Sequence, residues 1–351
     1  MNQIVRIGKY SVGPGLRPLI IAEMSGNHGG SLQRALAMVD AAAAAGAHAL
    51  KLQTYTADTM TLASTGKEFV ITDPDSPWNG RNLHDLYQEA HTPWEWHLPI
   101  FERANQRGMI AFSSPFDESA VDFLETLDVP AYKIASFENT DFHLIRYVAE
   151  TGKPIIVSTG MATVAEIDEC VRACREAGCT QLILLKCTST YPAQPDDTNI
   201  LTIPHMRDLF SCNIGLSDHT MGNGVALASV ALGATVIEKH FILNRADGGV
   251  DAEFSIEPHD LASLVCESER VWRALGSVKY GPVGAETASI RYRRSIFVVE
   301  DLKKGDVLTV HNIRRLRPAV GLAAKHYDSI LGRPVKMDVG RGTALKWDML
   351  C

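Results

Sequence analysis

The sequence predicts an α/β protein, a (β/α)8 TIM barrel followed by a small β-rich domain, and three observations carry this prediction. Eight short apolar runs alternate with helical patterns between Leu19 and Leu275, which is the count of a closed parallel barrel. Several of these runs end on charged side chains, at the face where such barrels carry their sites. After Leu275 the alternation stops, and the 351-residue chain exceeds a barrel of about 250 residues.

The barrel elements follow one another in a regular order. The predicted strands are Leu19–Met24, Ala47–Gln53, Met109–Ser113, Ala131–Ser136, Pro154–Thr159, Gln181–Cys187, Asn213–Ser217 and Ala234–His240. The predicted helices are residues 31–45, 92–107, 117–126, 142–151, 163–177, 198–210, 223–232 and 259–275. The helix at 92–107 should be capped by Thr92, with Pro93 at its first position. An open doubly wound sheet is the alternative, but its Gly-rich first turn is missing.

The segments at the two ends define the domain organisation. Residues 1–16 predict a hairpin under the barrel with its turn near Gly8, so the catalytic domain spans 1–280. A linker over 281–293 precedes a domain at 294–351, and its predicted strands are Ser295–Glu300, Val307–Val310 and Arg314–Leu316. A domain of about 58 residues has marginal independent stability, so we expect it to lean on another surface.

Composition narrows the range of functions. The net charge is -7 with a pI near 5.9, and the absence of a Lys/Arg block predicts no nucleic-acid partner. No apolar run reaches the roughly 18–20 residues that span a bilayer, so we expect no membrane partner. Seven cysteines, an odd count without a CxxC pair or a secretory leader, predict reduced thiols and a cytoplasmic location.

Two histidines follow the last two predicted strands. His219 and His240 would lie side by side at the strand ends, which favours a site over two isolated structural residues. Two imidazoles without paired cysteines leave coordination positions open for water and substrate oxygens. With Asp218 and Asp251 nearby in sequence, the set predicts a hard or borderline divalent ion such as Mn²⁺, Mg²⁺ or Co²⁺.

Two lysines and a ring of hydroxyl groups predict an anion site. Lys51 and Lys133 lie on the second and fourth strands, with Lys186 as a further candidate on the sixth. Hydroxyl side chains recur near the intervening strand ends, among them Ser114, Ser136, Ser158 and Ser217. Ammonium groups with neutral donors in a dry pocket suit a phosphate or a carboxylate. A Schiff base on a buried lysine is the competing chemistry, but it would leave the two histidines unexplained.

Two carboxylates complete the candidate site. Glu23 closes the first strand and is a general base, an acceptor for a substrate hydroxyl or a partner of Lys51. Glu138 lies just after the fourth strand and is available for proton transfer or for stabilising a cationic transition state.

Seven ordered segments resemble the sialic acid synthase family along almost the whole chain. They are IAEMSGNH (21–28), KLQT (51–54), SSPF (113–116), YKIAS (132–136), VSTGM (157–161), GLSDH (215–219) and IEKHF (237–241). The resemblance implies a TIM barrel followed by an antifreeze-protein-like (SAF) domain, and a transferase that condenses phosphoenolpyruvate with an acylated amino sugar. The first segment and the stretch 247–258 are most similar to the pseudaminic acid synthase branch, which implies 2,4-diacetamido-2,4,6-trideoxy-altrose as the sugar.

The resemblance also implies a role for each site residue. Phosphoenolpyruvate would be held by Lys51, Ser114, Lys133, Ser136, Ser158 and Ser217, and the metal by His219 and His240. Glu23 and Tyr191 would position the sugar, and Asp251 would contact its hydroxyls or a metal-bound water. Arg317 would lie over the acyl group of a sugar bound to the partner chain, which implies a domain-swapped homodimer.

Departures from the family keep alternatives open. Ser189 stands where neuraminate synthases carry an asparagine that contacts the sugar, and Val250 stands where the branch usually has proline. An N-acetylneuraminate or legionaminate synthase is therefore the second choice. A Schiff-base aldolase and a sugar-binding barrel without activity are the remote alternatives.

Overall fold

The computed structural model describes residues 4–74 and 76–351, and its larger unit is a closed barrel of eight parallel strands. The strands pair in the order β10-β3-β4-β5-β6-β7-β8-β9, so the last strand closes on the first and the predicted closed barrel is confirmed. The barrel strands are β3 (Leu19–Glu23), β4 (Ala49–Thr54), β5 (Ile110–Pro115), β6 (Tyr132–Ile134), β7 (Ile155–Ser158), β8 (Leu182–Cys187), β9 (Asn213–Asp218) and β10 (Val236–His240).

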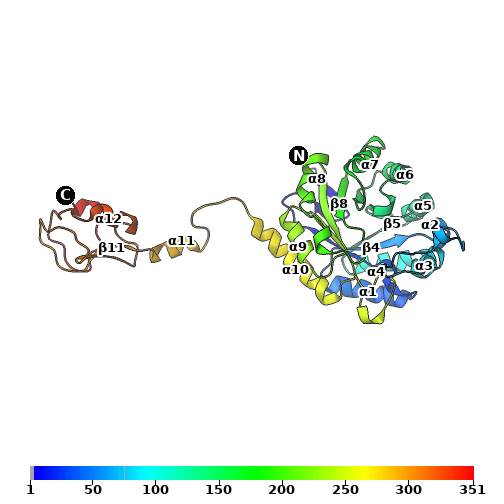
Figure 1. The fold of residues 1–351 in the computed structure, drawn as a ribbon, viewed down its shortest axis with the longest axis horizontal. Helices are drawn as coiled ribbons and strands as arrows, with labels where there is room; N and C mark the ends of the chain where they lie inside the picture. Colours follow the sequence, from blue (N-terminus) through cyan, green and yellow to red (C-terminus); the bar gives the residue numbers. More distant parts are fainter. Residues whose placement is uncertain (1–3, 75) are drawn as a thin grey trace. The chain divides into compact units, whose positions relative to one another are not determined.

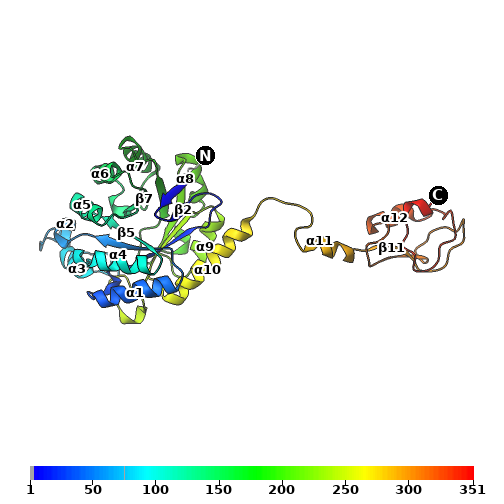
Figure 2. The ribbon, with the colours of Figure 1, turned by 180° about the vertical axis from the view of Figure 1, so that it is seen from behind.

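Helices surround the strands on the outside of the barrel (Figure 1 and Figure 2). They are α1 (Leu32–Ala44), α2 (Ala57–Met60), α3 (Leu83–Ala90), α4 (His97–Gln106), α5 (Glu118–Thr126), α6 (Phe142–Glu150), α7 (Val164–Glu176), α8 (Thr202–Phe210), α9 (Gly224–Ala231) and α10 (Pro258–Leu275). Short 3-10 turns lie between them: Ser25–His28, Lys67–Phe69, Trp94–Trp96, Ser136–Glu138, Pro195–Asp197 and Arg245–Asp247. The strands are almost wholly buried because the helices cover one face and the barrel interior the other.

The predicted helix start at Thr92 is wrong. A 3-10 turn at Trp94–Trp96 comes first, and α4 begins at His97 without a side-chain cap. Thr92 is buried, and its hydroxyl hydrogen-bonds Nε2 of His28 at 3.1 Å, so it is not available to cap the helix. A tertiary partner therefore overrides the local capping signal.

A hairpin lies at the amino-terminal end of the barrel. Strands β1 (Val5–Ile7) and β2 (Tyr10–Val12) pair antiparallel, and Gly8 turns between them at a φ of 55°, as the sequence predicts. Residues 1–3 of the predicted hairpin lie outside the described residues. The amide of Arg6 donates to Gln181 just before β8, and Asn213 at the start of β9 donates to the carbonyl of Val12. These contacts place the hairpin at the barrel end opposite the strand C-termini.

The C-terminal unit, Ser277–Cys351, has a hydrophobic core of its own around Ile296, Ile313 and Leu345. Its elements are α11 (Glu286–Ser289), a turn at Ile290–Tyr292, β11 (Ser295–Val298), β12 (Ile313–Leu316), a turn at Ala324–His326, α12 (Tyr327–Ile330) and a turn at Trp347–Met349. Strands β11 and β12 pair antiparallel. The expected strand Val307–Val310 is wrong, because only Val307 forms an isolated bridge there. Two short helical elements occupy the segment expected to be a linker.

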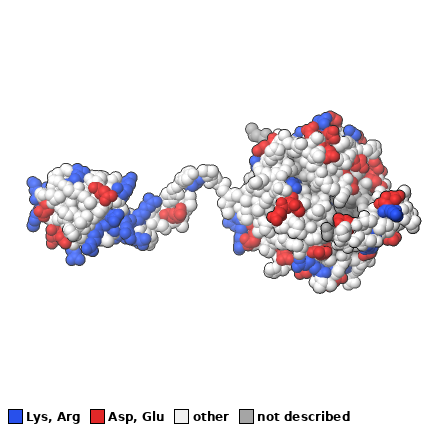
Figure 3. Space-filling view, in the orientation of Figure 1, with Lys and Arg blue, Asp and Glu red and all other residues white. Residues whose placement is uncertain are grey.

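Charge differs strongly between the two units. Residues 277–351 contain 14 Lys and Arg against 7 Asp and Glu, whereas residues 1–276 contain 20 against 34. Basic side chains gather along one side of the C-terminal unit (Figure 3). Its formal charge is therefore positive in a chain that is acidic as a whole.

Two further expectations concern the cysteines and the membrane. All seven cysteines are free thiols, five of them buried. Within residues 4–74 and 76–351, no helix combines the length and apolar character that crossing a membrane requires.

Candidate active site

The register of the barrel brings the polar strand ends together. Glu23 of β3 is level with Lys51 of β4 on one side and with His240 of β10 on the other. Glu238 of β10 is level with Ser217 of β9. Because alternate residues of a strand point to opposite faces, each of these side chains points into the barrel together with its level neighbours.

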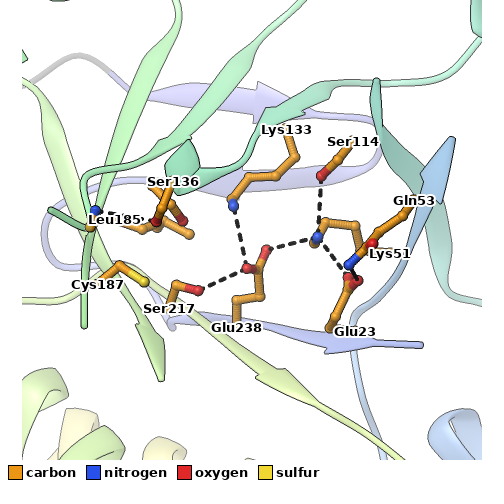
Figure 4. Close-up of polar contacts among 12 residues, drawn as sticks. Glu23, Lys51, Gln53, Ser114, Lys133, Ser136, Leu185, Cys187, Ser217 and Glu238 are labelled. Carbon is orange, nitrogen blue, oxygen red and sulfur yellow. Dashed lines mark hydrogen bonds and ion pairs between the residues drawn. The ribbon is translucent and has the colours of Figure 1, made fainter. Parts of the chain in front are cut away.

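Four buried charges form the centre of the site, and we call Glu23, Lys51, Lys133 and Glu238 the lysine–glutamate cluster (Figure 4). Nζ of Lys51 lies 2.7 Å from Glu23 and 3.9 Å from Glu238, and Nζ of Lys133 lies 3.4 Å from Glu238. All four side chains are nearly inaccessible to water. Burying two ammonium groups with two carboxylates balances the formal charge, which limits the desolvation cost of each ion.

Hydroxyl and amide groups bind the edges of this cluster. Lys51 donates to Ser114 at 3.2 Å, and Ser217 donates to Glu238 at 3.0 Å. Gln53 donates to Glu23 at 3.0 Å. The predicted pairing of Glu23 with Lys51 is therefore present, and Glu238 is an additional partner of both lysines.

The environment shifts the pKa values of the four groups in different directions. Burial lowers the pKa of Lys133, and the Glu238 carboxylate offsets only part of that effect. Burial also opposes the charge of Lys51, but Glu23 and Glu238 outweigh it and raise the pKa of Lys51. Burial raises the pKa of Glu23 despite Lys51 beside it, whereas Lys133 and Lys51 overcome burial and lower the pKa of Glu238. The environment thus disfavours the charged form of Glu23 and favours that of Glu238.

Two more of the predicted serines are Ser136, in the turn after β6, and Ser158, at the end of β7. Ser136 accepts a hydrogen bond from the amide of Gly160 at 3.2 Å. A side chain at Gly160 would collide with the hydroxyls of both Ser136 and Ser189, so glycine leaves room for these two side chains. The hydroxyl of Ser158 is buried and has no hydrogen-bond partner among the described residues. An unsatisfied buried hydroxyl is available to a ligand.

The two histidines are adjacent, as the sequence predicts. The ring centroids of His219 and His240 are 5.4 Å apart, and Tyr191 packs on His219 at 4.4 Å. Nδ1 of His219 donates to the carbonyl oxygen of Thr188 at 2.9 Å, which leaves the lone pair on Nε2. Nδ1 of His240 is buried without a hydrogen-bond partner, and burial keeps the pKa of His240 well below its usual value. Burial opposes the charge of His219, but Cys187 and the Thr188 carbonyl outweigh it and raise the pKa of this ring. The paired imidazoles fit a divalent cation once both rings are neutral.

The two aspartates expected near these histidines, Asp251 and Asp218, have different partners. Oδ2 of Asp251 lies 3.7 Å from Nδ1 of His240. Asp218 instead forms a buried ion pair with Lys239 at 2.8 Å, so the expectation that it supports the histidines is wrong. Its alternation along β9 directs it away from the barrel interior. Among the described residues no group of three or more His, Cys, Asp or Glu is arranged to hold a metal, so water or substrate must complete any coordination shell.

A cavity of about 920 Å³ opens over these groups, a volume within the range of small-molecule sites. Its polar lining includes Ser25, Gln53, Glu138, Ser189, His240 and Asp251. The excursion between β4 and β5 contributes an apolar wall, formed by Met60, Ile71, Pro77, Trp78, Leu83, Leu86, Tyr87 and Ala90. The indole of Trp78 donates to the carbonyl of Val250 at 2.7 Å, which ties this wall to the loop after β10.

Glu138 faces the same cavity from the turn after β6. Burial raises its pKa to about 7, although Lys133 acts in the opposite direction. Its Oε2 is buried and has no hydrogen-bond partner among the described residues. A carboxyl group with a pKa near neutrality can both give and accept a proton at the working pH.

Sequence reasoning assigned most of these residues but not all. The structure brings the predicted barrel residues together around the cavity or the cluster beneath it, except for two. Asp218 pairs with Lys239 on the outward face, and Nζ of Lys186 donates to the carbonyl of Cys187. Arg317 lies exposed on the C-terminal unit. Glu238, Gln53 and Ser25 were not assigned. The signal for Glu238 was available, because an inward-facing His240 implies an inward-facing residue two positions earlier.

A closed parallel barrel with buried ammonium groups, paired imidazoles and a cavity at the strand C-termini defines a barrel enzyme that acts on small anionic ligands. The chain belongs to the NeuB family. The model of that family matches residues 38–280, and the SAF domain model matches residues 293–350, which confirms the resemblance drawn from the seven segments.

Known proteins are similar along nearly the whole chain. The pseudaminic acid synthase of Campylobacter jejuni subsp. jejuni serotype O:2 is 40% identical over 342 residues, covering 97% of this chain and 98% of that protein. The N,N'-diacetyllegionaminic acid synthase of the same organism is 33% identical, covering 90% and 95%. The crystal structure of N-acetylneuraminic acid (sialic acid) synthetase from Leptospira borgpetersenii serovar Hardjo-bovis, in complex with citrate, has a TM-score of 0.74 and 33% identity, covering 83% of this chain and 96% of that one.

Proposed function

We propose that this chain is a nonulosonic acid synthase, a transferase that condenses phosphoenolpyruvate with an open-chain acetamido sugar and releases phosphate. The favoured sugar is 2,4-diacetamido-2,4,6-trideoxy-altrose, which makes the chain a pseudaminic acid synthase. One observation carries the proposal: a balanced cluster of two buried lysines and two glutamates lies beside two adjacent imidazoles at the end of one barrel. That combination provides both an anion site and a cation site within one cavity.

Phosphoenolpyruvate would be held by Lys51, Lys133 and the surrounding hydroxyls, Ser114, Ser136, Ser158 and Ser217. Its phosphate and carboxylate would replace the glutamates as partners of the two ammonium groups, with protonation of Glu23 limiting the repulsion. The free hydroxyl of Ser158 would gain a partner at the same time. The ligand would therefore be bound by charge-assisted hydrogen bonds in a site that excludes water.

The sugar would occupy the cavity between the histidines and the apolar wall. A 2,4-diacetamido-2,4,6-trideoxy sugar carries a methyl group in place of the 6-hydroxyl and a second acetamido methyl. Leu86 and Tyr87 offer apolar surface to such methyl groups, whereas an additional sugar hydroxyl there would lose its hydrogen bonds to water. This wall favours the trideoxy sugar over N-acetylmannosamine, which retains the 6-hydroxyl. Glu23 and Tyr191 would orient the sugar from the polar side.

His219 and His240 would hold a divalent ion, Mn²⁺, Mg²⁺ or Co²⁺. When bound, such an ion supplies Lewis acidity to the aldehyde carbonyl at C1 of the sugar. Nδ1 of His240 is buried without a hydrogen-bond partner, and Nε2 is the ring nitrogen of His219 that does not bond the Thr188 carbonyl; these two atoms would bind the ion. Asp251 would orient a water or a sugar hydroxyl beside His240.

The reaction forms the bond between C3 of phosphoenolpyruvate and C1 of the sugar and leaves cationic character at C2. Water adds at C2, and phosphate departs with cleavage of the C–O bond. Glu138 would transfer the proton in this step, because its pKa of about 7 lets it act as base and then as acid. The carboxylate of Glu238, whose pKa is lowered by Lys133 and Lys51 despite burial, would stabilise the positive charge that develops at C2.

The C-terminal unit would complete the site of a second copy, giving a domain-swapped homodimer. Its positive formal charge complements the acidic residues 1–276, and Arg317 is exposed and free to cover an acyl group. We place the reaction in the cytoplasm, which agrees with seven free thiols.

Product identification tests the proposal most directly. The purified protein is incubated with phosphoenolpyruvate and a panel of acetamido sugars, phosphate release is measured, and the product is identified by mass spectrometry and NMR. A nine-carbon keto acid from the trideoxy sugar is expected. Preference for N-acetylmannosamine or for the legionaminic acid precursor would move the chain to a neighbouring branch, and no phosphate release with any sugar would refute the proposal.

The remaining alternative, a Schiff-base aldolase, predicts a different outcome. It requires a neutral lysine amine that attacks a carbonyl, and trapping with borohydride and a keto acid would then attach the acid to Lys133. Lys133 lies 3.4 Å from the Glu238 carboxylate, an arrangement that suits a charged ammonium group. We therefore expect no trapped adduct.

A further inference from the structure

Ser25 adopts a backbone conformation that its side chain makes costly. Its φ of 45° lies in the left-handed region, which is unfavourable for a residue with a Cβ and not for glycine. The following Gly26 is confined as well, because a side chain there would collide with Val250 and with the backbone of Ala90. The turn is therefore fixed by its surroundings, and a serine is kept where glycine would fit the backbone better.

The hydroxyl of Ser25 connects two segments of the site. It donates to Oδ2 of Asp251, 226 residues away in sequence, and accepts a hydrogen bond from Nε2 of Gln53 at 3.1 Å. The same Gln53 amide donates its other proton to Oε1 of Glu23 at 3.0 Å. Both amide protons and the hydroxyl proton are thus used, which fixes the direction of the chain from Glu23 to Asp251.

This chain of hydrogen bonds surrounds the polar side of the cavity. Ser25, Gln53 and Asp251 all line it, and Ser25 and Asp251 are more than nine-tenths buried. Glu23 is held from its other oxygen by Lys51 at 2.7 Å, and Asp251 approaches His240 at 3.7 Å. The serine therefore couples a carboxylate of the lysine–glutamate cluster to a carboxylate beside the histidines.

We propose that Ser25 is a positioning residue for the sugar substrate, which holds Gln53 and Asp251 in the orientation that binds the sugar hydroxyls. The inference rests on the proposed function. A purely structural role explains the turn but not the serine, since glycine adopts this φ without strain. The hydroxyl is what the strained conformation provides, and its partners are the groups that face the cavity.

Kinetics of the Ser25→Gly variant test the proposal. Glycine keeps the backbone conformation at this positive φ, so the variant should fold, as circular dichroism would verify. Loss of a hydrogen bond to a charged group should raise the KM for the sugar about ten- to a hundredfold. The KM for phosphoenolpyruvate should change by no more than about threefold, because the lysines remain in place.

Two further variants separate positioning from a general disturbance. Ser119→Ala removes a serine hydroxyl outside the cavity lining, which donates to Asp117 at 2.9 Å, and should leave both KM values within about twofold. Asp251→Asn should raise the sugar KM, and adding Ser25→Gly to it should cost little more, because the serine acts through the aspartate.

The outcomes are distinct from those that decide the proposed function. Failure of the parent chain to release phosphate with any acetamido sugar refutes the proposed function, and with it the role of Ser25. If the parent chain turns over normally, three results would refute the role of Ser25 alone. These are an unchanged sugar KM in Ser25→Gly, an equal rise in both KM values, or full additivity with Asp251→Asn.

Discussion

Replacing Lys133 by methionine tests how the lysine–glutamate cluster binds an anion. Nζ of Lys133 lies 3.4 Å from Oε1 of Glu238, and the side chain is 2% exposed. The Lys133→Met variant removes one of two buried ammonium groups, so the cluster changes from formal neutrality to a charge of -1. It loses an attractive contact with phosphoenolpyruvate and retains a carboxylate that repels it.

The expected loss follows from the contact removed. A hydrogen bond to a charged group contributes about 1.5–3 kcal/mol, so the KM for phosphoenolpyruvate should rise about ten- to over a hundredfold. The KM for the sugar should change far less. Phosphate release, measured while each substrate is varied at a saturating level of the other, gives both constants. Equal effects on both substrates would refute the anion-binding role of Lys133.

Two matched variants separate binding from stability. Lys239→Met removes an equally buried lysine, paired with Asp218 at 2.8 Å on the outward face of β10. It should lower the free energy of unfolding on the order of 3 kcal/mol and leave the phosphoenolpyruvate KM unchanged. Adding Glu238→Gln to Lys133→Met should recover stability, because no buried carboxylate then lacks its partner. Full recovery of phosphoenolpyruvate affinity in that double variant would contradict our account.

Three more predictions follow from the site. Chelation should abolish turnover and Mn²⁺, Mg²⁺ or Co²⁺ should restore it, while His219→Ala and His240→Ala should be folded by circular dichroism and inactive; full activity of verified metal-free protein would contradict the metal role. The folded state raises the pKa of Glu138 from 4.5 to about 7, so its stabilising contribution is complete below pH 4.5 and lost as the pH rises through 7. The free energy of unfolding of Glu138→Gln, measured with urea, should therefore rise relative to that of the parent chain by on the order of 3 kcal/mol from pH 4 to pH 8. A difference that stays constant with pH would argue against the shift. Mixing inactive Arg317→Ala and His240→Ala chains should restore partial activity through one intact hybrid site, and no recovery after verified subunit exchange would count against the domain-swapped homodimer.

Part of the site was predictable because a parallel barrel imposes simple geometry on its strand ends. Once the apolar runs indicated a closed barrel, residues at the ends of those runs had to converge on one face. Lys51, Lys133, His219 and His240 were placed correctly for this reason alone. The same alternation would also have directed Glu238 inward with His240, had it been applied.

Other predictions failed where a distant partner decided the outcome. Thr92 has the local signature of a helix cap, but its hydroxyl bonds His28 instead. Asp218 adjoins His219 in sequence, but it pairs with Lys239 because successive side chains of a strand face opposite sides. Local propensity and proximity in sequence are weak where a buried polar group must find a tertiary partner.

The sequence by itself determined the closed barrel and the set of charged residues at its strand ends, because hydrophobic periodicity and strand order are properties of the chain. The family followed from the resemblance of seven ordered segments. Only the tertiary structure decided which of these groups are partners. The contact between Ser25 and Asp251 joins residues 226 positions apart, and the balance of Lys133 by Glu238 depends on two strands that are not neighbours in the barrel. Such pairings depend on burial and distance, and those arise only when the barrel closes and water is excluded from its interior.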